Sequence, residues 1–370
     1  MSRYELTITP NYVSNWTVDD ALREIFQNAI DESNSNPEHV MEYNYSEDNE
    51  TLMVFNKGAF LEKKTLLLGE TSKSEGNTIG QFGEGYKIAT IVLLRYGLSL
   101  VINNANEVWT PRIVKSRRYG SDIVVFDVKK SKNNVDGLEF KVQGLDCDTW
   151  KNFEDNKFLS KSKYPKCERT EFGNVLLDEE YKGKVYVCGL YICKNEQLCF
   201  GYDFVSSVIK LDRDRGLVDY FDMRVACGKV LNCCENKEVI EKSLSFVDSD
   251  FIVPSWDERI RGTALKTVAE DLAKKHLIGL SSDCVITTNI DKYTELVGLG
   301  KKAKYISEKE HRILESSETW SKQTKFESET SSVKDMLIEW FNDCKKELSD
   351  DLIERGQVIV DTLVKFYLSN

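Results

Sequence analysis

The chain has 370 residues, of which 41% are hydrophobic and 11% aromatic, and its formal net charge is −11. This length predicts two or three domains, and the apolar content is sufficient to build packed cores. The acidic balance gives an overall field that repels DNA and anionic membranes, so nucleic-acid binding is not indicated. The sequence has no uninterrupted apolar stretch near the ~18 residues of a transmembrane helix, and its start lacks the apolar core of a signal peptide. We therefore expect a cytoplasmic protein with no membrane segment.

The ten cysteines and three histidines do not form a recognisable metal motif. The sequence has no CxxC pair of the kind found in structural zinc sites, and we interpret the cysteines as reduced, mostly buried thiols. A local basic groove around Arg112, Lys115, Arg117 and Arg118 is an alternative that stays open. Solvated charges beside a strand are the preferred interpretation of these four residues.

The first helical pattern begins at Thr17, which is followed three residues later by Asp20 in a variant of the capping box. An apolar stripe then recurs at helical spacing and predicts a buried face made of Leu22, Ile25, Phe26 and Ala29. Glu24, Asn28 and Asp31 are spaced i, i+4 and i+7, so they share a second face. Such a row of acid, amide and acid is either an exposed polar face or one side of a binding site.

Strand patterns dominate the sequence after this helix. The expected strands cover residues 41–46, 51–56, 98–104, 108–114, 121–128 and 137–144. Helices combined with a meander of strands predict a layer of helices on a mixed or antiparallel sheet, and hence an α+β fold.

Between the second and third of these strands lies the glycine-punctuated segment 69–87, which leads into an apolar run at 88–97. Glycines let backbone N–H groups approach a ligand closely, and the N-terminus of a following helix suits a phosphate. Taken alone, a glycine-rich loop can equally be a mobile connection.

The rest of the chain predicts a linker and two further units. Residues 146–182 are polar and are interpreted as a short helix and a linker, residues 183–280 as a second α/β domain, and residues 281–370 as a small α/β and helical region. The elements expected there are strands at 182–194, 197–204, 284–289 and 303–306, and helices ending near 233 and covering 255–276, 291–299, 308–317, 333–351 and 353–368. Segment 245–253 fits either a strand or a loop.

Two polar motifs stand in a definite order along the chain. The first helix carries ExxxNxxD as residues 24–31, and the glycine-rich segment carries GxxGxGxK as residues 80–87. This order resembles the GHKL ATPase superfamily of DNA gyrase, heat-shock chaperones, histidine kinases and MutL. The resemblance covers roughly residues 10–145 and implies a Bergerat-type ATP-binding α/β sandwich for residues 1–145.

The resemblance also implies roles for individual residues. Asn28 would hold magnesium together with the phosphates, and Glu24 would orient or deprotonate the attacking water. Asp31 belongs to the same ATP-binding face. The remaining residues implied in ATP binding lie on loops and at the start of the next helix: Asn56, Gly58, Ser72, Lys73, Gly80, Gly83, Gly85 and Lys87. Ser72 and Lys73 would belong to a lid over the nucleotide.

Two positions depart from the family pattern. The family's DxGxG motif has an aspartate that accepts a hydrogen bond from the exocyclic amine of adenine, and Asn56 stands in its place here. An amide can accept through its oxygen or donate through its nitrogen, so ATP is favoured while GTP stays open. Gly137 and Leu138 stand where the family has Gly-Thr, so the hydroxyl that contacts the base-binding aspartate is absent.

Residues 209–214 look like the segment of the chaperone middle domain that supplies an arginine to the γ-phosphate. Arg213 is the candidate, because a guanidinium group suits the charge that develops on a transferring phosphoryl group. The alternative is an arginine paired with Asp212 and Asp214 at the start of a helix. On this resemblance, residues 183–280 are interpreted as a transducer-like domain of the chaperone or MutL type.

The resemblance therefore implies a magnesium-dependent ATP hydrolase in which lid closure, and dimerisation, act as a conformational switch on a protein partner. The alternative is a non-hydrolysing, nucleotide-regulated binding or inhibitor module. The sequence identifies neither the partner nor the pathway.

Overall fold

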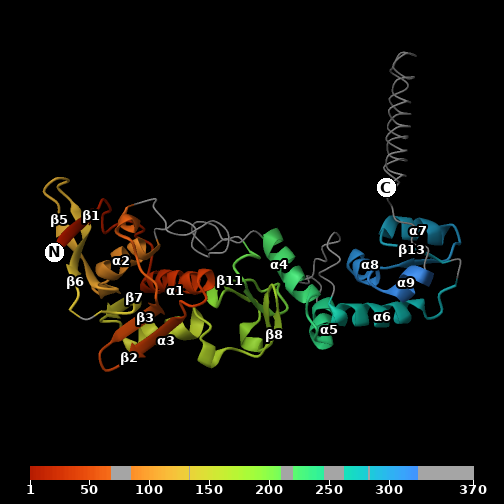
Figure 1. Ribbon diagram of the computed structural model, residues 1–370. Coiled ribbons are helices and arrows are strands. Elements are labelled where there is room, and N and C mark those ends of the chain that lie inside the picture. The colour runs from red at the N-terminus through yellow and green to blue at the C-terminus, as the bar shows by residue number, and fades with distance from the viewer. Residues whose placement is uncertain (68–84, 133, 210–219, 246–261, 282–283, 324–370) are drawn as a thin grey trace, which may run out of the picture. The chain divides into compact units, whose positions relative to one another are not determined.

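The computed structural model describes residues 1–67, 85–132, 134–209, 220–245, 262–281 and 284–323 (Figure 1). The chain divides into two compact units, Met1–Ala264 and Leu265–Asn370. The expected boundary at 280/281 therefore differs from the observed one, because the helix expected at 255–276 belongs largely to the second unit.

The first unit contains a seven-stranded antiparallel sheet with the strand order β1-β6-β5-β4-β7-β3-β2. Its strands are β1 (Ser2–Leu6), β2 (Met41–Ser46), β3 (Thr51–Lys57), β4 (Ser99–Asn104), β5 (Glu107–Lys115), β6 (Asp122–Lys130) and β7 (Gly137–Gln143). All six strands expected in this region are confirmed, and β1 is an additional strand that pairs with β6. The α+β class is likewise confirmed.

Two helices, α1 (Val18–Ser35) and α2 (Gly85–Arg95), pack against each other and against the strands of this sheet (Figure 1). The apolar stripe of α1 is fully buried between these layers. Phe26 makes ring contacts with Tyr43, Trp150, Phe153 and Phe158, with centroid separations of 4.9 to 6.0 Å. This aromatic cluster fixes α1 to β2 and to the next helix, α3 (Cys147–Asn156).

A second sheet of the first unit contains five short strands in the order β11-β10-β12-β9-β8. They are β8 (Cys167–Thr170), β9 (Gly173–Leu176), β10 (Lys184–Val187), β11 (Leu190–Lys194) and β12 (Gly201–Phe204), and β10 and β12 run parallel. Two of these strands, β8 and β9, lie in residues 146–182, which were expected to form a short helix, observed as α3, and a linker. Each has four residues and mixed polarity, so neither shows the alternation that marks a strand.

The segment 182–194 was expected to be one strand and is instead the hairpin β10–β11. The chain reverses at Cys188 and Gly189, whose φ angles are +49° and +82°. Two successive residues with positive φ form the tight turn that matches the twist of a hairpin. Cysteine is an uncommon residue at such a position, so the turn was not visible in an otherwise apolar run.

Helices α4 (Tyr220–Asn232) and α5 (Lys237–Ser245) follow in the first unit, and short 3-10 turns occur at Lys63–Leu66 (η1), Lys161–Lys163 and Glu179–Tyr181. The second unit contains most of α6 (Thr263–Leu277), then β13 (Val285–Thr287), α7 (Ile290–Gly298), β14 (Ala303–Tyr305), α8 (Glu308–Leu314) and α9 (Glu318–Gln323). Its parallel pair β13–β14 packs in a core with Ala273, Ile286, Ile306, Leu314 and Trp320. The helices expected at 333–351 and 353–368, and nearly all of segment 245–253, lie outside the described residues.

Two of the four basic residues near β5, Arg112 and Arg118, have contacts within their own part of the sheet. Arg112 Nε lies 2.6 Å from Asp127 Oδ2, and Arg3 Nε lies 2.9 Å from Asp127 Oδ1. Hydrogen bonds from Arg3 and Arg112 lower the pKa of Asp127 and keep it ionised. The guanidinium of Arg118 lies over the ring of Tyr119. These contacts favour solvated, locally paired charges over a basic groove.

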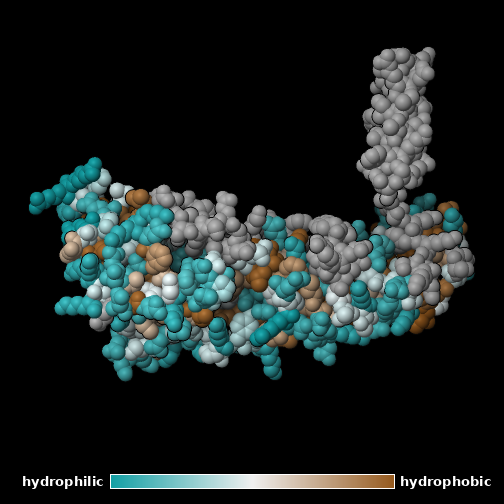
Figure 2. Space-filling model, viewed as in Figure 1, coloured by the Kyte–Doolittle hydropathy of each residue, from teal (hydrophilic) through white to brown (hydrophobic). Residues whose placement is uncertain are grey.

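On the face seen in Figure 2, hydrophilic residues cover most of the described surface, and hydrophobic residues form separate small areas. Within the part of the chain that the structure describes, no helix is both long enough and apolar enough to cross a bilayer.

Candidate functional site

Helix α1 supplies the side chains at the centre of the candidate site. Its start is fixed by Thr17, whose main-chain N–H and hydroxyl both donate to Asp20 Oδ2 over 2.8 Å. Glu24 and Asp31 lie outside the apolar stripe and are nevertheless buried, with 2% and 0% of their surface exposed. Carboxylates are seldom buried to this extent without specific partners. The second face of α1 is therefore not an exposed polar face.

The start of α2 lies directly against this second face. A β-carbon on Gly85 would overlap Oε2 of Glu24 and would stand 3.3 Å from Cδ of Glu24 and 3.4 Å from Nδ2 of Asn28. The missing side chain of Gly85 is what lets the first turn of α2 rest on the carboxylate and the amide of α1. The last glycine of GxxGxGxK and two residues of ExxxNxxD thus meet in space.

Asn28 is half-buried beside Glu24. Its Nδ2 donates to the main-chain oxygen of Glu24 over 2.8 Å, and this bond fixes the orientation of the amide. The amide oxygen is the type of hard ligand that magnesium accepts, and one or two protein oxygens are sufficient when phosphates and water complete the shell. Among the described residues, no group of three or more His, Cys, Asp or Glu side chains could hold a metal ion by itself.

Asn56 is buried at the end of β3, with 4% of its surface exposed, and it faces α1. Its Nδ2 lies 2.9 Å from the main-chain oxygens of both Ala29 and His39, and 3.2 Å from Ser33 Oγ. Carbonyl oxygens only accept hydrogen bonds, so the amide must present its nitrogen to them. The side-chain oxygen of Asn56 therefore faces away from these two carbonyls.

Gly58 ends the turn that follows β3. Its φ of +75° lies in the left-handed region, and its N–H donates to the main-chain oxygen of Asp136 over 3.0 Å. A β-carbon at this position would also stand 3.0 Å from two atoms of the His39 ring. The ring Nδ1 of His39 lies 2.6 Å from Glu32 Oε1. Backbone geometry and packing thus account for the glycine at this position without any contact to a ligand.

Lys87 is fully buried, and its ammonium group is held within the protein. Nζ donates to the main-chain oxygens of Thr65 and Leu67 over 2.8 and 2.5 Å. The neighbouring Tyr86 hydroxyl lies 3.0 Å from Thr65 Oγ1, and burial raises the pKa of Tyr86. Lys87 thereby ties α2 to the end of η1. A phosphate contact of the kind predicted from the sequence would compete with these two carbonyls.

The other predicted residues of the site lie outside the described residues: Ser72, Lys73, Gly80, Gly83 and Arg213. Of the predicted set, the structure brings together Glu24, Asn28 and Gly85. It places Asn56 against the main chain of the same helix, one turn further along.

Ser33, His39 and Thr65 support the site but were not identified from the sequence. Ser33 Oγ lies 3.1 and 2.8 Å from the main-chain oxygens of Ala29 and His39, to which its single hydroxyl hydrogen can donate, and it accepts from Asn56. Carbonyl acceptors are present on every residue, so a sequence pattern does not mark such bonds. The i−4 spacing of Ser33 and Ala29 is the only local hint.

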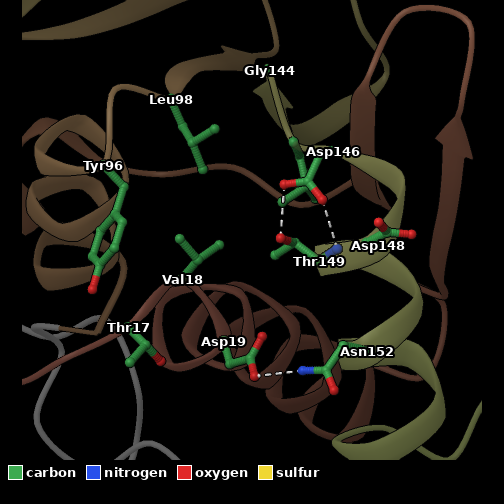
Figure 3. Close-up of a pocket in the computed structure, with 11 residues that line it drawn as sticks. Thr17, Val18, Asp19, Tyr96, Leu98, Gly144, Asp146, Asp148, Thr149 and Asn152 are labelled. Atoms are coloured by element: carbon green, nitrogen blue, oxygen red, sulfur yellow. Dashed lines mark hydrogen bonds between the residues drawn. The ribbon is translucent and has the colours of Figure 1, made fainter.

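A groove of about 710 Å³ lies elsewhere on the first unit, where the starts of α1 and α3 meet the end of α2 (Figure 3). Asp146 caps α3 by accepting from the N–H and hydroxyl of Thr149, each over 2.8 Å. Asp19 accepts from Asn152 over 3.1 Å, and burial raises the pKa of Asp19. None of the predicted site residues lines this groove, so it is separate from the candidate site.

Comparison with known proteins gives two sequence matches. A family model described as the Mycoplasma pneumoniae MPN635 N-terminal domain matches residues 151–237, which run from α3 through the five-stranded sheet to the start of α5. The chain is also 23% identical over 207 residues to an uncharacterized protein of Mycoplasma pneumoniae. That alignment covers 54% of this chain and 83% of the relative.

Solved structures with partial similarity include ATPase regions of topoisomerase II. Two are from Saccharomyces cerevisiae, one of them bound to ICRF-187 (dexrazoxane), and each is 12% identical with TM-scores of 0.31 and 0.30. A third comprises the ATPase and transducer domains of DNA topoisomerase II from Balamuthia mandrillaris, at 13% identity and a TM-score of 0.27. Each similarity covers 47% of this chain, and the chain spans about three fifths of the length of these proteins, 62%, 62% and 60% respectively.

The contact of Gly85 predicts a specific effect of adding one methyl group. Gly85→Ala forces the buried Glu24 carboxylate to move, and overpacking of this kind costs about 1–3 kcal/mol of unfolding free energy. Urea unfolding followed by circular dichroism measures the change. Gly298→Ala is the matched control, because a β-carbon there meets no atom within 4 Å. Equal stability of the two variants would contradict the close contact.

The burial of Lys87 predicts that removing its ammonium group destabilises the first unit. Lys87→Met leaves two buried carbonyls without their donor, at a cost of about 1–3 kcal/mol for each. The nearby Lys64 has 53% of its side chain exposed, so Lys64→Met should change stability by less than about 0.5 kcal/mol. Thermal and urea unfolding of both variants provide the comparison. A Lys87→Met protein as stable as the parent would show that the bonds from Lys87 to Thr65 and Leu67 do not stabilise the first unit.

Proposed function

We propose that this chain is an ATP-binding protein of the GHKL type that hydrolyses ATP with magnesium. The observation that carries the proposal is the contact of Gly85 with Glu24 and Asn28, which joins the two polar motifs. Gly85 is the first described residue of helix α2, and the N-terminal end of a helix has N–H groups without intrahelical partners and a positive dipole end. A helix N-terminus next to an amide and an acid suits a nucleotide phosphate with a metal ion and a water molecule.

Glu24 is the proposed general base. It would accept a proton from the water that attacks the γ-phosphate, a role that contributes roughly 10²–10⁴-fold to rate. Asn28 would hold magnesium through its amide oxygen, and magnesium, when bound, supplies positive charge against the phosphates. Both residues lie on the same face of one rigid helix, so their separation is set by the helix and not by a loop. Asp31 extends this face by one turn.

The base end of the proposed pocket is formed around Asn56. Its nitrogen is engaged by the main chain of Ala29 and His39, so its oxygen is the group available to a base. An oxygen acceptor suits the exocyclic amine of adenine, whereas guanine presents a carbonyl oxygen at the equivalent position. This orientation supports ATP over GTP, although the chain has an amide in place of the family's aspartate.

The rest of the proposed machinery rests on the sequence motifs. Gly80 and Gly83 would direct N–H groups to the phosphates, Ser72 and Lys73 would belong to the lid, and Arg213 would approach the γ-phosphate. Lid closure and dimerisation would then act as a cytoplasmic conformational switch on a protein partner.

The second candidate function is a nucleotide-regulated binding or inhibitor module that does not turn ATP over. It is favoured by one observation, the use of the Lys87 ammonium by two main-chain carbonyls, because this removes a cation from the phosphate end. Binding without hydrolysis in the parent protein would decide for this module.

The proposed role of Glu24 predicts that binding and turnover can be separated. Glu24→Gln keeps the shape of the side chain but cannot take a proton, so hydrolysis should fall at least about 100-fold while ATP binding persists. Phosphate release and isothermal calorimetry measure the two quantities. Glu38→Gln, a change at an exposed acid just beyond the end of the same helix, is the control and should leave both unchanged. Undiminished hydrolysis by Glu24→Gln would exclude the assigned role.

The orientation of Asn56 predicts both base selectivity and an unusual effect of the family residue. ATP should bind about tenfold or more tightly than GTP, because the carbonyl oxygen of guanine would face the side-chain oxygen of Asn56, and neither can donate a hydrogen bond. Asn56→Asp would place a carboxylate oxygen against the carbonyls of Ala29 and His39, so it should weaken ATP binding and stability, by about 1–3 kcal/mol. Calorimetry with both nucleotides tests this, with the exposed Asn44→Asp as control. Improved ATP binding by Asn56→Asp would refute the orientation argument.

A further inference from the structure

The hairpin turn at Cys188 and Gly189 contacts helix α1 from the five-stranded sheet. Asn34 Nδ2, in the last turn of α1, donates to the Sγ of Cys188 over 3.7 Å. Burial raises the pKa of the Cys188 thiol to about 11, with a smaller contribution from the charge of Asp203 and the smallest from Asp31. The thiol is therefore neutral at physiological pH and lies near the C-terminal half of the helix that carries Glu24 and Asn28.

The conformation of Cys188 shows that this contact is maintained at a cost. Its φ of +49° lies in a region that side chains other than those of glycine, asparagine and aspartate rarely adopt. Glycine or asparagine would form the turn with less strain. A cysteine at this position is explained by its side chain, which reaches α1, and not by the turn itself.

The turn is held rigidly on its own sheet. Gly189 N–H donates to Asp203 Oδ1 over 2.7 Å, and Cys188 N–H donates to the main-chain oxygen of Phe204 over 2.8 Å. The main-chain oxygen of Gly189 accepts from Leu159 N–H over 2.8 Å. Three bonds from two other segments thus fix both residues of the turn to β12 and to the chain that leads from α3.

Asp203 is itself held in place by buried partners. It has 7% of its surface exposed and accepts from the Tyr164 hydroxyl over 2.5 Å, and that hydroxyl accepts from Asn174 Nδ2 over 2.7 Å. Asp203 and Asn174 are cross-strand partners in the register of β12 and β9. A buried carboxylate is costly unless its oxygens are bonded. Here the bonded carboxylate connects β12 to the turn directly and to β9 through Tyr164.

We propose that the Cys188–Gly189 turn, positioned by Asp203, is a contact through which α1 transmits ligand binding at Glu24 and Asn28 to the five-stranded sheet. The inference rests on the proposed nucleotide function, since a ligand must first act on α1. The helix carries the ligand-facing side chains and Asn34 on one rigid element of 18 residues. A small shift of α1 therefore changes the contact with a turn that cannot move independently of β12.

Hydrogen exchange of the full chain, with and without magnesium and a non-hydrolysable ATP analogue, tests this inference. In the parent protein the analogue should slow exchange about tenfold or more in α1 and also in residues 187–190 and β12. Cys188→Ala removes only Sγ, so protection of α1 should persist while protection of the turn and β12 is lost. Cys193→Ala, which removes a thiol from the adjacent strand β11, is the matched control and should behave as the parent.

Two further variants keep the test decisive. Cys188→Gly adopts the turn without strain and should lose the coupled protection even if the alanine variant folds poorly. Asp203→Asn replaces the carboxylate that accepts from Gly189 N–H and from the Tyr164 hydroxyl by an amide with only one accepting oxygen. It should therefore speed exchange of the Gly189 amide and weaken the coupling without abolishing analogue binding. Coupled protection that survives in both Cys188 variants would overturn the inference, as would protection of α1 alone in the parent. Absence of protection in α1, with no binding by calorimetry, would instead contradict the proposed function and with it the inference.

Discussion

The absence of a side chain at Gly85 is the constraint on which the arrangement of the first unit depends. Helices α1 and α2 pack against each other on the seven-stranded sheet, and the carboxylate of Glu24 and the amide of Asn28 lie directly against Gly85. A larger residue would separate the helices or displace the acid. Glycine at the start of a helix costs conformational entropy, so its presence here is explained by this contact and not by helix formation.

Helix α1 is consequently enclosed by contacts along most of its length. One side packs in the aromatic cluster around Phe26, a second meets α2, and the main-chain oxygen of Ala29 accepts from Asn56. The last turn contacts the Cys188 turn of the other sheet. Close-packed neighbours resist small displacements of such a helix. It therefore moves between discrete positions, if it moves at all, and does not shift gradually. That property suits an element that responds to a ligand.

Much of the fold was predictable from the sequence, because most strands of the seven-stranded sheet are short runs rich in β-branched and aromatic residues that are separated by turn residues. The expected strand 41–46 matches β2, and the other five differ from the observed strands by only one or two residues at their ends. Strand β1 was not predicted, because its sequence SRYEL is polar and its pairing with β6 is distant in the chain. Strands β8 and β9 were too short to show a period. The hairpin at Cys188 was hidden by a continuous apolar run.

Some features of the candidate site were likewise predictable from the sequence, and others were not. The resemblance of residues 24–31 and 80–87 to the GHKL motifs predicted that they belong to one site, and the structure places Gly85 against Glu24 and Asn28. The partners of Asn56 and Lys87 were not predictable, because both side chains bind main-chain carbonyls that have no signature in the sequence. The orientation of an amide and the burial of an ammonium group depend on the packed structure.

Strand β1 also determines which strand is exposed at one edge of the seven-stranded sheet. Without it, β6 would present unpaired N–H and C=O groups along a strand rich in valine, which is the type of edge that templates aggregation. With it, the outermost strand is SRYEL, and Arg3 is held by Asp127 across the pair. Charged side chains on a short edge strand disfavour the addition of a further strand. The five residues of β1 thus cover the edge of β6 that would otherwise be open to pairing with another chain.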